Sequence, residues 1–402
     1  MTVSVFVPST QTSQGLSGRR RRLFAIAGVM TALFAALALL LHAENQIAVV
    51  AILAVLVALI GVADTTAIGR ELTAACRDHA GFGNGLALLG GVALIALFRH
   101  EHYTLLMIAT VAFFATACIG LNLQLAFAGV VNFAGAAFFV IGSYTAAVLA
   151  AHTALPHLLV LAACGIVTGL LGLIVLFPVL RTRGHYAALV TIAFGLLIRS
   201  FLEVNDLLGG PQGLKIPGLD IFGIQFNRVR EIGPFDVSFY VPYALFGLAL
   251  FAAAFLLVRL IENSWIGIAL DAVRADEVAA SVFGLSIANW KAFAFVVGNI
   301  LIGIAGGAYG MMNGFINPNG AGLADSLIML SIIVLGGLGN MWGTVGAAIV
   351  ILVLPEKLQA VQEYRLLIFA ILVMLILRYR PSGIMPRPLR KLSRYASRGA
   401  DA

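Results

Sequence analysis

The chain has 402 residues, of which 61% are hydrophobic and only 11% charged, with a mean hydropathy of +1.02 and a net charge of +7. Soluble domains carry about 25% charged residues, so this composition excludes a soluble globular protein. Apolar runs of roughly 17–25 residues, the length that crosses a bilayer as a helix, recur along the chain. Because backbone groups in a bilayer must pair within each segment, the sequence predicts an all-α polytopic membrane protein.

The basic residues gather at the ends of apolar runs, at 19–22, 181–183 and 378–398. This pattern is typical of cytoplasmic loops and of contact with anionic lipid head groups, and it does not indicate nucleic-acid binding. The arginines at 19–22 precede an apolar run longer than that of a usual signal peptide. We therefore expect an uncleaved first span with the N-terminus in the cytoplasm.

Further spans follow the first in chain order, and tracking sides from a cytoplasmic N-terminus places 204–238 outside and 259–291 inside. A cytoplasmic basic tail requires an even number, so ten or twelve spans fit. The choice depends on 326–358, where GGLGNMWG interrupts an apolar run. Glycine-broken helices of this kind hold binding sites in transporters. The predicted spans lie near 47–63, 82–98, 103–121, 133–151, 158–180, 187–203, 239–258, 292–312, 326–338, 343–358 and 364–378.

Several motifs are missing from the sequence. It has no G-x-x-x-x-G-K-[ST] phosphate loop and no H-E-x-x-H, G-x-S-x-G or C-x-x-C pattern. We therefore expect no catalytic residues, no metal site and no cofactor, and an intramembrane enzyme would lack its reactive groups. A secondary transporter or channel is a further alternative, although few intramembrane carboxylates are present for ion coupling.

Polar side chains inside the apolar runs are costly there and usually face a cavity or a partner. Arg199 and Glu203 are four residues apart on one helix face, so we expect them to pair near the end of their span, with a substrate contact as the alternative. Glycines spaced by four, as at 303–307 and 306–310, favour close helix packing. The alternative is that they act as hinges or line the pore. The candidates for a translocation path are Asn122, Gln124, Asn132, Ser143, Tyr144, Thr191 and Asn299.

The densest mixture of both charge signs lies at 259–291, between two apolar runs. Within it, DAVRADEVAASVFGLS has an acidic start, two alanines and a glycine stop. This pattern predicts a short amphipathic helix, running from Arg274 to Gly284, on which a soluble partner could act. A solvated connecting loop is the alternative. The candidate coupling residues are Asp271, Arg274, Asp276, Glu277, Ala279, Ala280 and Gly284.

Seven segments carry a resemblance to a known family through their order and spacing. Over 103–385 the chain resembles the branched-chain amino-acid ABC transporter permease family, on its LivM-like side. The segments are GLNLQLAFAG (120–129), IGSYTAA (141–147), LRTRGHYAALVTIAFGLLIR (180–199), LLGGPQGL (207–214), AVRADEVAASVFGL (272–285), MLSIIVLGGLGNMWGTVGAAI (329–349) and PSGI (381–384).

The resemblance implies a pore domain in the bacterial inner membrane that moves branched-chain or related amino acids. Its implied partners are a homologous LivH-like permease, two cytoplasmic ABC ATPases, a periplasmic binding protein and the lipid bilayer. The segment 272–285 resembles the ATPase-coupling loop of ABC importers. The general EAA-x-x-x-G pattern places Val278 at its acidic position, with Glu277 one residue early. The turn formed by Gly209, Gly210, Pro211, Gln212 and Gly213 resembles the family's GGPNGL and is a candidate contact for the binding protein.

The resemblance also implies a division of the chain and leaves the substrate open. We expect N-terminal transmembrane helices over 1–100, a permease core over 101–385 with the coupling loop 259–291, and a basic cytoplasmic tail over 386–402. LivM-like members commonly show G-Q-x-S-L-G-H-A where this chain has Val130, Asn132 and Gly135 at the three polar positions. Asn132-Phe133-Ala134 is more similar to the LivH-like branch, so urea, amides and small carboxylates stay as alternative substrates.

Overall fold

The computed structural model describes residues 12–43, 80–182, 186–221, 223–227, 230–232 and 235–357, with the isolated positions 364, 367, 371, 374, 378 and 383. These residues belong to two compact units, 1–104 and 105–402. In the first unit, α1 (Thr12–His42) packs against α4 (Ala80–Leu97). Gly90 of α4 leaves room there for the ring of Phe34. The predicted span 47–63 lies outside the described residues.

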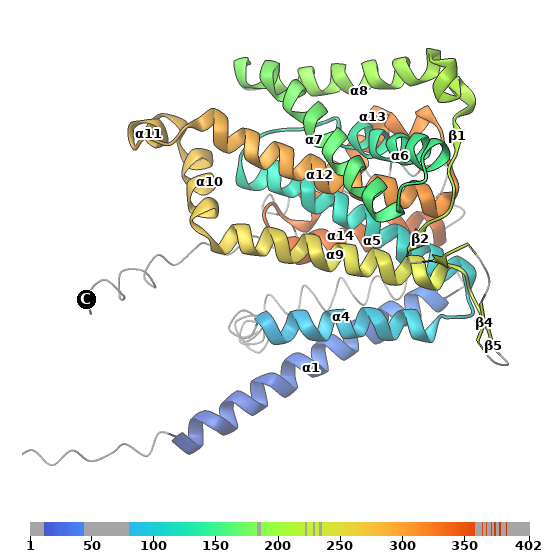
Figure 1. Ribbon diagram of the computed structural model, residues 1–402. Coiled ribbons are helices and arrows are strands. Elements are labelled where there is room, and N and C mark those ends of the chain that lie inside the picture. Colours follow the sequence, from blue (N-terminus) through green and yellow to red (C-terminus); the bar gives the residue numbers. More distant parts are fainter. Residues whose placement is uncertain are drawn as a thin grey trace, which may run out of the picture. The chain divides into compact units, whose positions relative to one another are not determined.

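The second unit is built around one central helix. Helix α12 (Ile287–Asn313) makes its most extensive contacts with α6 (Gly135–His152) and α7 (His157–Arg181) (Figure 1). The other helices surround these three or extend from them. They are α5 (His102–Asn122), which continues into the π-helical segment η1 (Leu123–Phe127), α8 (Tyr186–Val204), α9 (Tyr240–Asn263), α10 (Trp265–Ala275), α11 (Glu277–Val282), α13 (Leu323–Gly336) and α14 (Met341–Lys357).

Glycines allow α12 to approach its two neighbours closely. A Cβ on Gly306 would collide with the backbone carbonyl of Phe139 in α6. A Cβ on Gly303 would collide with the side chain of Thr168 in α7. Small residues at helix interfaces bring backbones together in this way in membrane proteins. The packing interpretation of the glycine spacing at 303–307 and 306–310 therefore holds in this structure.

Among the described residues, six helices are long and apolar enough to cross a membrane, which agrees with a polytopic membrane protein. The predicted ten or twelve spans are not confirmed. Helix α13 has 14 residues, fewer than the roughly 20 that a bilayer needs, and most of the predicted span 364–378 lies outside the described residues. The six helices are His102–Phe127, Gly135–His152, His157–Arg181, Tyr186–Val204, Tyr240–Asn263 and Ile287–Asn313.

Short antiparallel strand pairs are a local exception to the all-α expectation. Three pairs are present among the described residues, and two of them fold the polar stretch before α9 into hairpins. Figure 1 places these hairpins and β1 at one end of the second unit, and α10 and α11 at the opposite end. The pairs are β1 (Leu214–Lys215) with β6 (Phe315–Ile316), β2 (Asp220–Ile221) with β3 (Ile224–Gln225), and β4 (Arg230–Ile232) with β5 (Phe235–Val237).

Candidate translocation and coupling sites

Helix α5 ends in an irregular segment inside the protein. Its last turn is the π-helical η1, and the chain then reverses through Gly129, which has a φ of 68°. The carbonyl of Gln124 accepts a hydrogen bond from the Val130 amide at 3.0 Å, which closes the reversal. Single turns of π-helix are frequent at functional sites. The predicted spans 103–121 and 133–151 left these residues as a connection, whereas the structure buries most of them.

Three carboxamide side chains meet beside this reversal, and we call Gln124, Asn132 and Asn299 the amide cluster. Asn132 Nδ2 donates to Gln124 Oε1 at 2.8 Å, and Gln124 Nε2 donates to Asn299 Oδ1 at 3.1 Å. Gln124 Nε2 also donates to the carbonyl of Phe295 at 3.1 Å. All three side chains are buried, and Asn299 lies roughly midway along α12. The structure thus joins three of the seven path candidates deep in the bundle.

One donor of the amide cluster is unsatisfied. Within the described part of the chain, the buried Asn299 Nδ2 has no hydrogen-bond partner. This atom packs against Gly172 of α7, where a Cβ would not fit. A buried donor without an acceptor costs about 1–3 kcal/mol and is rare in native proteins. The amide cluster therefore keeps a hydrogen-bond donor that is not used in this conformation.

Among the described residues, the other four path candidates form no hydrogen bond with the side chains of the amide cluster, and those that are bonded have other partners. Asn122 donates to Thr344 Oγ1 at 3.1 Å and accepts from the Gly339 amide at 2.9 Å, so it holds the turn between α13 and α14. Ser143 donates to the Gly306 carbonyl at 2.6 Å across the α6–α12 contact. The hydroxyl of Thr191 accepts from the amide of Phe133 at 3.1 Å. The hydroxyl of Tyr144 is buried and has no partner among the described residues.

The charged segment forms two helices, so the predicted short helix before Gly284 is present but begins at Glu277 and not at Arg274. Helix α10 ends at Ala275, and α11 begins at Glu277. Between them Asp276 is extended, and its carboxylate accepts from the amides of Val278 at 2.8 Å and Ala279 at 3.0 Å. Aspartate is among the preferred residues at this capping position. Gly284 follows α11 with a φ of 80°, the left-handed conformation that commonly ends helices.

Helix α11 exposes apolar side chains. Val278, Val282 and Phe283 are 74%, 79% and 86% exposed, whereas Ala280 is buried. Glu277 forms an ion pair with Lys291 of α12 at 2.6 Å, which ties α11 to the bundle. The apolar residues directed outward make an exposed patch of the kind that marks interaction sites. Of the coupling candidates, Ala279 and Glu277 share this exposed surface, and Asp271 is half-buried in α10.

Arg274 is an exposed residue that also bonds to another element. Its guanidinium donates a hydrogen bond to the carbonyl of Ala126 in η1. Helix α10 contacts η1, so this bond joins the charged segment to the irregular end of α5.

The turn 209–213 lies at the opposite end of the second unit. Two short 3-10 turns, η2 (Asp206–Leu208) and η3 (Gly210–Gln212), shape it, and Asn205 caps the first through the Leu207 amide at 3.1 Å. Pro211 and Gln212 are exposed, whereas Gly210 is buried. The backbone at Gly213 packs against that of Ile316, where β1 pairs with β6.

The expected ion pair is present near this turn. Arg199 Nε lies 2.8 Å from Glu203 Oε1, and Arg199 Nη2 donates to Asn319 Oδ1 at 3.3 Å. The bond to Asn319 joins α8 to η4 (Pro318–Ala321). Both side chains are more than a third exposed, so the ion pair adds little stability.

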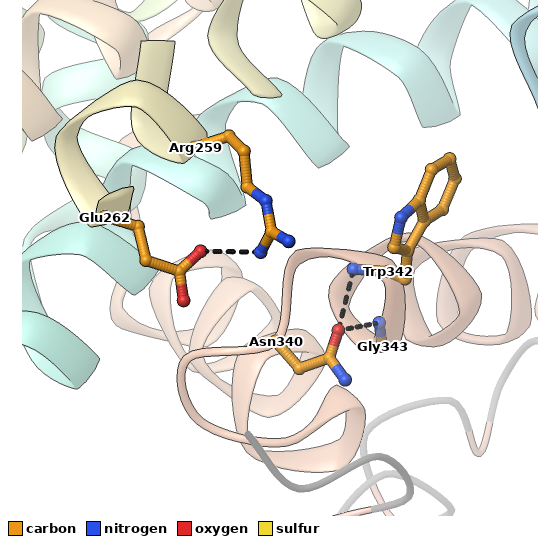
Figure 2. A network of polar contacts seen from close by, with 5 residues as sticks. All are labelled: Arg259, Glu262, Asn340, Trp342 and Gly343. Carbon is orange, nitrogen blue, oxygen red and sulfur yellow. Dashed lines mark hydrogen bonds and ion pairs between the residues drawn. The ribbon is translucent and has the colours of Figure 1, made fainter. Parts of the chain in front are cut away.

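Figure 2 shows polar contacts at the end of α9 and the start of α14. Asn340 Oδ1 accepts from the amides of Trp342 at 3.0 Å and Gly343 at 3.2 Å, which caps α14 after the glycine turn. Arg259 Nη1 donates to Glu262 Oε2 at 2.9 Å. Asn340 was not among the predicted site residues, although an asparagine just before a helix is a typical capping signal.

No group of three or more His, Cys, Asp or Glu side chains among the described residues is arranged to hold a metal ion. The two candidate sites are the hydrogen-bonded amide cluster inside the bundle and the exposed helix α11 at one end of it.

Comparison with known proteins assigns the chain to a family. The family described as branched-chain amino acid transport system / permease component matches residues 103–377. The chain belongs to this family. The matched region contains the amide cluster, α10, α11 and the turn 209–213, while the first unit lies almost wholly outside it.

Named relatives agree with the family assignment. The chain is 33% identical over 301 residues to the high-affinity branched-chain amino acid transport system permease protein LivM of Escherichia coli, covering 71% of each chain. It is 26% identical to LivH of Escherichia coli and 30% identical to BraD of Pseudomonas aeruginosa, in each case over 68% of this chain and 92% of the relative. No solved structure matches the chain.

Proposed function

We propose that the chain is the transmembrane permease subunit of an ATP-driven importer for branched-chain or related amino acids. Its partners would be a second, LivH-like permease, two cytoplasmic ABC ATPases and a periplasmic binding protein. The names of the relatives LivM and LivH support the transport role. The observation that carries the ATP-driven mechanism is α11, an exposed apolar helix on a chain whose sequence has no phosphate loop.

The proposal includes an orientation and a division of the chain. The α10–α11 end would face the cytoplasm of a bacterium, with the protein in the inner membrane and both termini cytoplasmic. Residues 1–100 would form added transmembrane helices, 101–385 the permease core and 386–402 a basic cytoplasmic tail. The basic clusters at 19–22 and 378–398 support this orientation.

For the coupling site, we propose that α11 seats in a groove of an ATPase subunit. Val278, Val282 and Phe283 would be buried there, and Asp276 would fix the helix start. A short helix laying its apolar face into a groove is a common recognition mode. In this chain the acidic position of the general coupling pattern is the exposed Val278, so the contact at that position would be apolar.

For the translocation path, we propose that the amide cluster meets the substrate. Carboxamides offer both donors and acceptors, which suits the carboxylate and ammonium groups of an amino acid. The unused Asn299 Nδ2 supports this role, because it would gain an acceptor if α7 and α12 moved apart around a substrate. The exposed turn 209–213, at the far end from α11, would contact the binding protein.

Purification with the partners tests the proposal. The chain would be produced together with its sister permease, the ATPases and the binding protein, and ATP hydrolysis would be measured in lipid nanodiscs. We expect the ATPases to co-purify and hydrolysis to rise when the binding protein carries leucine, isoleucine or valine. Stimulation by urea, an amide or a small carboxylate alone would move the substrate to that class. Absence of ATPase co-purification would contradict the importer.

A further inference from the structure

Arg274 joins two parts of the protein that are far apart in sequence. It lies in the last turn of α10, and its guanidinium donates to the carbonyl of Ala126 in η1. Its Cγ atom lies 3.7 Å from the position that a Cβ would take on Gly129. The side chain therefore lies along the point where α5 ends and the chain reverses.

The charge of Arg274 suits this position. The last carbonyls of a helix have no donors within that helix, and they carry the negative end of its dipole. A guanidinium has five N–H donors and stays charged, so it caps such an end well.

The capped segment also holds the amide cluster. Ala126 and Gln124 belong to the same five-residue segment η1. Gln124 bonds to Asn299 on one side and to Asn132 on the other. Displacement of η1 along its axis would therefore change both bonds.

We propose that Arg274 is a positioning residue that transmits movement of the α10–α11 segment to the amide cluster through η1. It would act inside the permease, and the ATPase contact would belong to α11. An irregular helix end that can adopt two arrangements is the kind of element through which two sites can be coupled. This inference rests on the proposed function, since the movement of α11 would come from an ATPase.

The experiment measures transport per ATP hydrolysed in proteoliposomes that contain the whole importer. Arg274→Ala removes the cap, Arg274→Gln keeps a donor without charge, and Arg274→Lys keeps the charge. The matched control is Arg259→Gln, because Arg259 pairs with Glu262 of its own helix. ATPase co-purification and basal hydrolysis are measured for each variant.

We expect Arg274→Ala to retain co-purified ATPases and basal hydrolysis while transport per ATP falls at least tenfold. Arg274→Gln should fall less, Arg274→Lys least, and Arg259→Gln should match the unmodified protein. Three results would overturn the inference: unchanged transport per ATP in Arg274→Ala, loss of the ATPases in step with transport, or failure of all three variants to assemble. If the unmodified chain recruits no ATPase, the proposed function itself fails.

Discussion

The amide cluster and α11 differ in which side chains they bury and which they expose. The amide cluster buries polar side chains deep between helices. The amide nitrogens of Gln124 and Asn132 donate hydrogen bonds there, and that of Asn299 does not. Helix α11 does the opposite, since it exposes apolar side chains at one end of the bundle. Buried polar groups are costly, and exposed apolar patches are unfavourable in isolation. In the proposed function, the amide cluster would rearrange inside the protein and α11 would bind a partner.

Replacing the apolar patch should give the largest effect. The double variant Val282→Ser/Phe283→Ser removes two side chains that would each contribute about 1.5–3 kcal/mol on burial. We expect at least a tenfold loss of ATPase affinity, measured as co-purification and by binding of the purified ATPase to nanodiscs. The double variant Val282→Leu/Phe283→Leu keeps the patch apolar and should retain affinity. Equal binding by both variants would remove α11 from the interface.

Removing the centre of the amide cluster should come next. Gln124→Leu removes the donor to the Phe295 carbonyl and the nearer of two donors to Asn299 Oδ1, which costs about 1–3 kcal/mol. We expect a lower melting temperature of the purified permease and loss of transport, with ATPase affinity unchanged.

Tyr144→Phe is the matched control for the amide cluster. Its buried hydroxyl has no partner among the described residues, so its removal should leave the melting temperature the same or slightly higher. If Gln124→Leu changed the melting temperature as little as Tyr144→Phe, the hydrogen bonds of the amide cluster would not stabilise the protein.

Close packing of α12 can be tested at a glycine. Gly306→Ala places a methyl group against the Phe139 carbonyl and should cost about 1–3 kcal/mol, seen as a lower melting temperature. Gly346→Ala in α14 meets nothing within 4 Å and should be neutral or stabilising. Similar melting temperatures for the two variants would contradict the packing.

The smallest effect is expected at the cap of α11. Asp276→Ala removes the acceptor for two backbone amides, which costs about 1 kcal/mol of local helix stability. The ATPase should then bind several-fold more weakly, as measured on nanodiscs. Asp276→Asn should restore binding, because asparagine caps equally well. A binding loss in Asp276→Asn that equals that in Asp276→Ala would show that the charge matters and the cap does not.

Local features were predictable from the sequence. Apolar length located α5, α7, α8 and α9 closely, because a bilayer fixes how long a spanning helix must be. Spacing of four residues predicted the Arg199–Glu203 pair. The alanines and Gly284 marked α11, although the capping role of Asp276, which separates it from α10, went unrecognised.

Contacts between distant segments were not predictable. Asn132 and Asn299 both stood out as polar residues in apolar runs, but hydropathy does not say which helices face each other. The inward bond of Arg274 depends on the end of α5, and nothing in the sequence near Arg274 indicates it. The strand pair between β1 and β6 depends likewise on chain path rather than on local pattern.

The most direct test of the account is the energy source for uptake. Proteoliposomes holding the chain, its sister permease and the ATPases would be supplied with the binding protein and radiolabelled leucine. We predict uptake only when ATP reaches the ATPases, unchanged by ionophores that collapse proton and sodium gradients. Uptake by the chain without ATPases, driven by an ion gradient and abolished by those ionophores, would contradict the account.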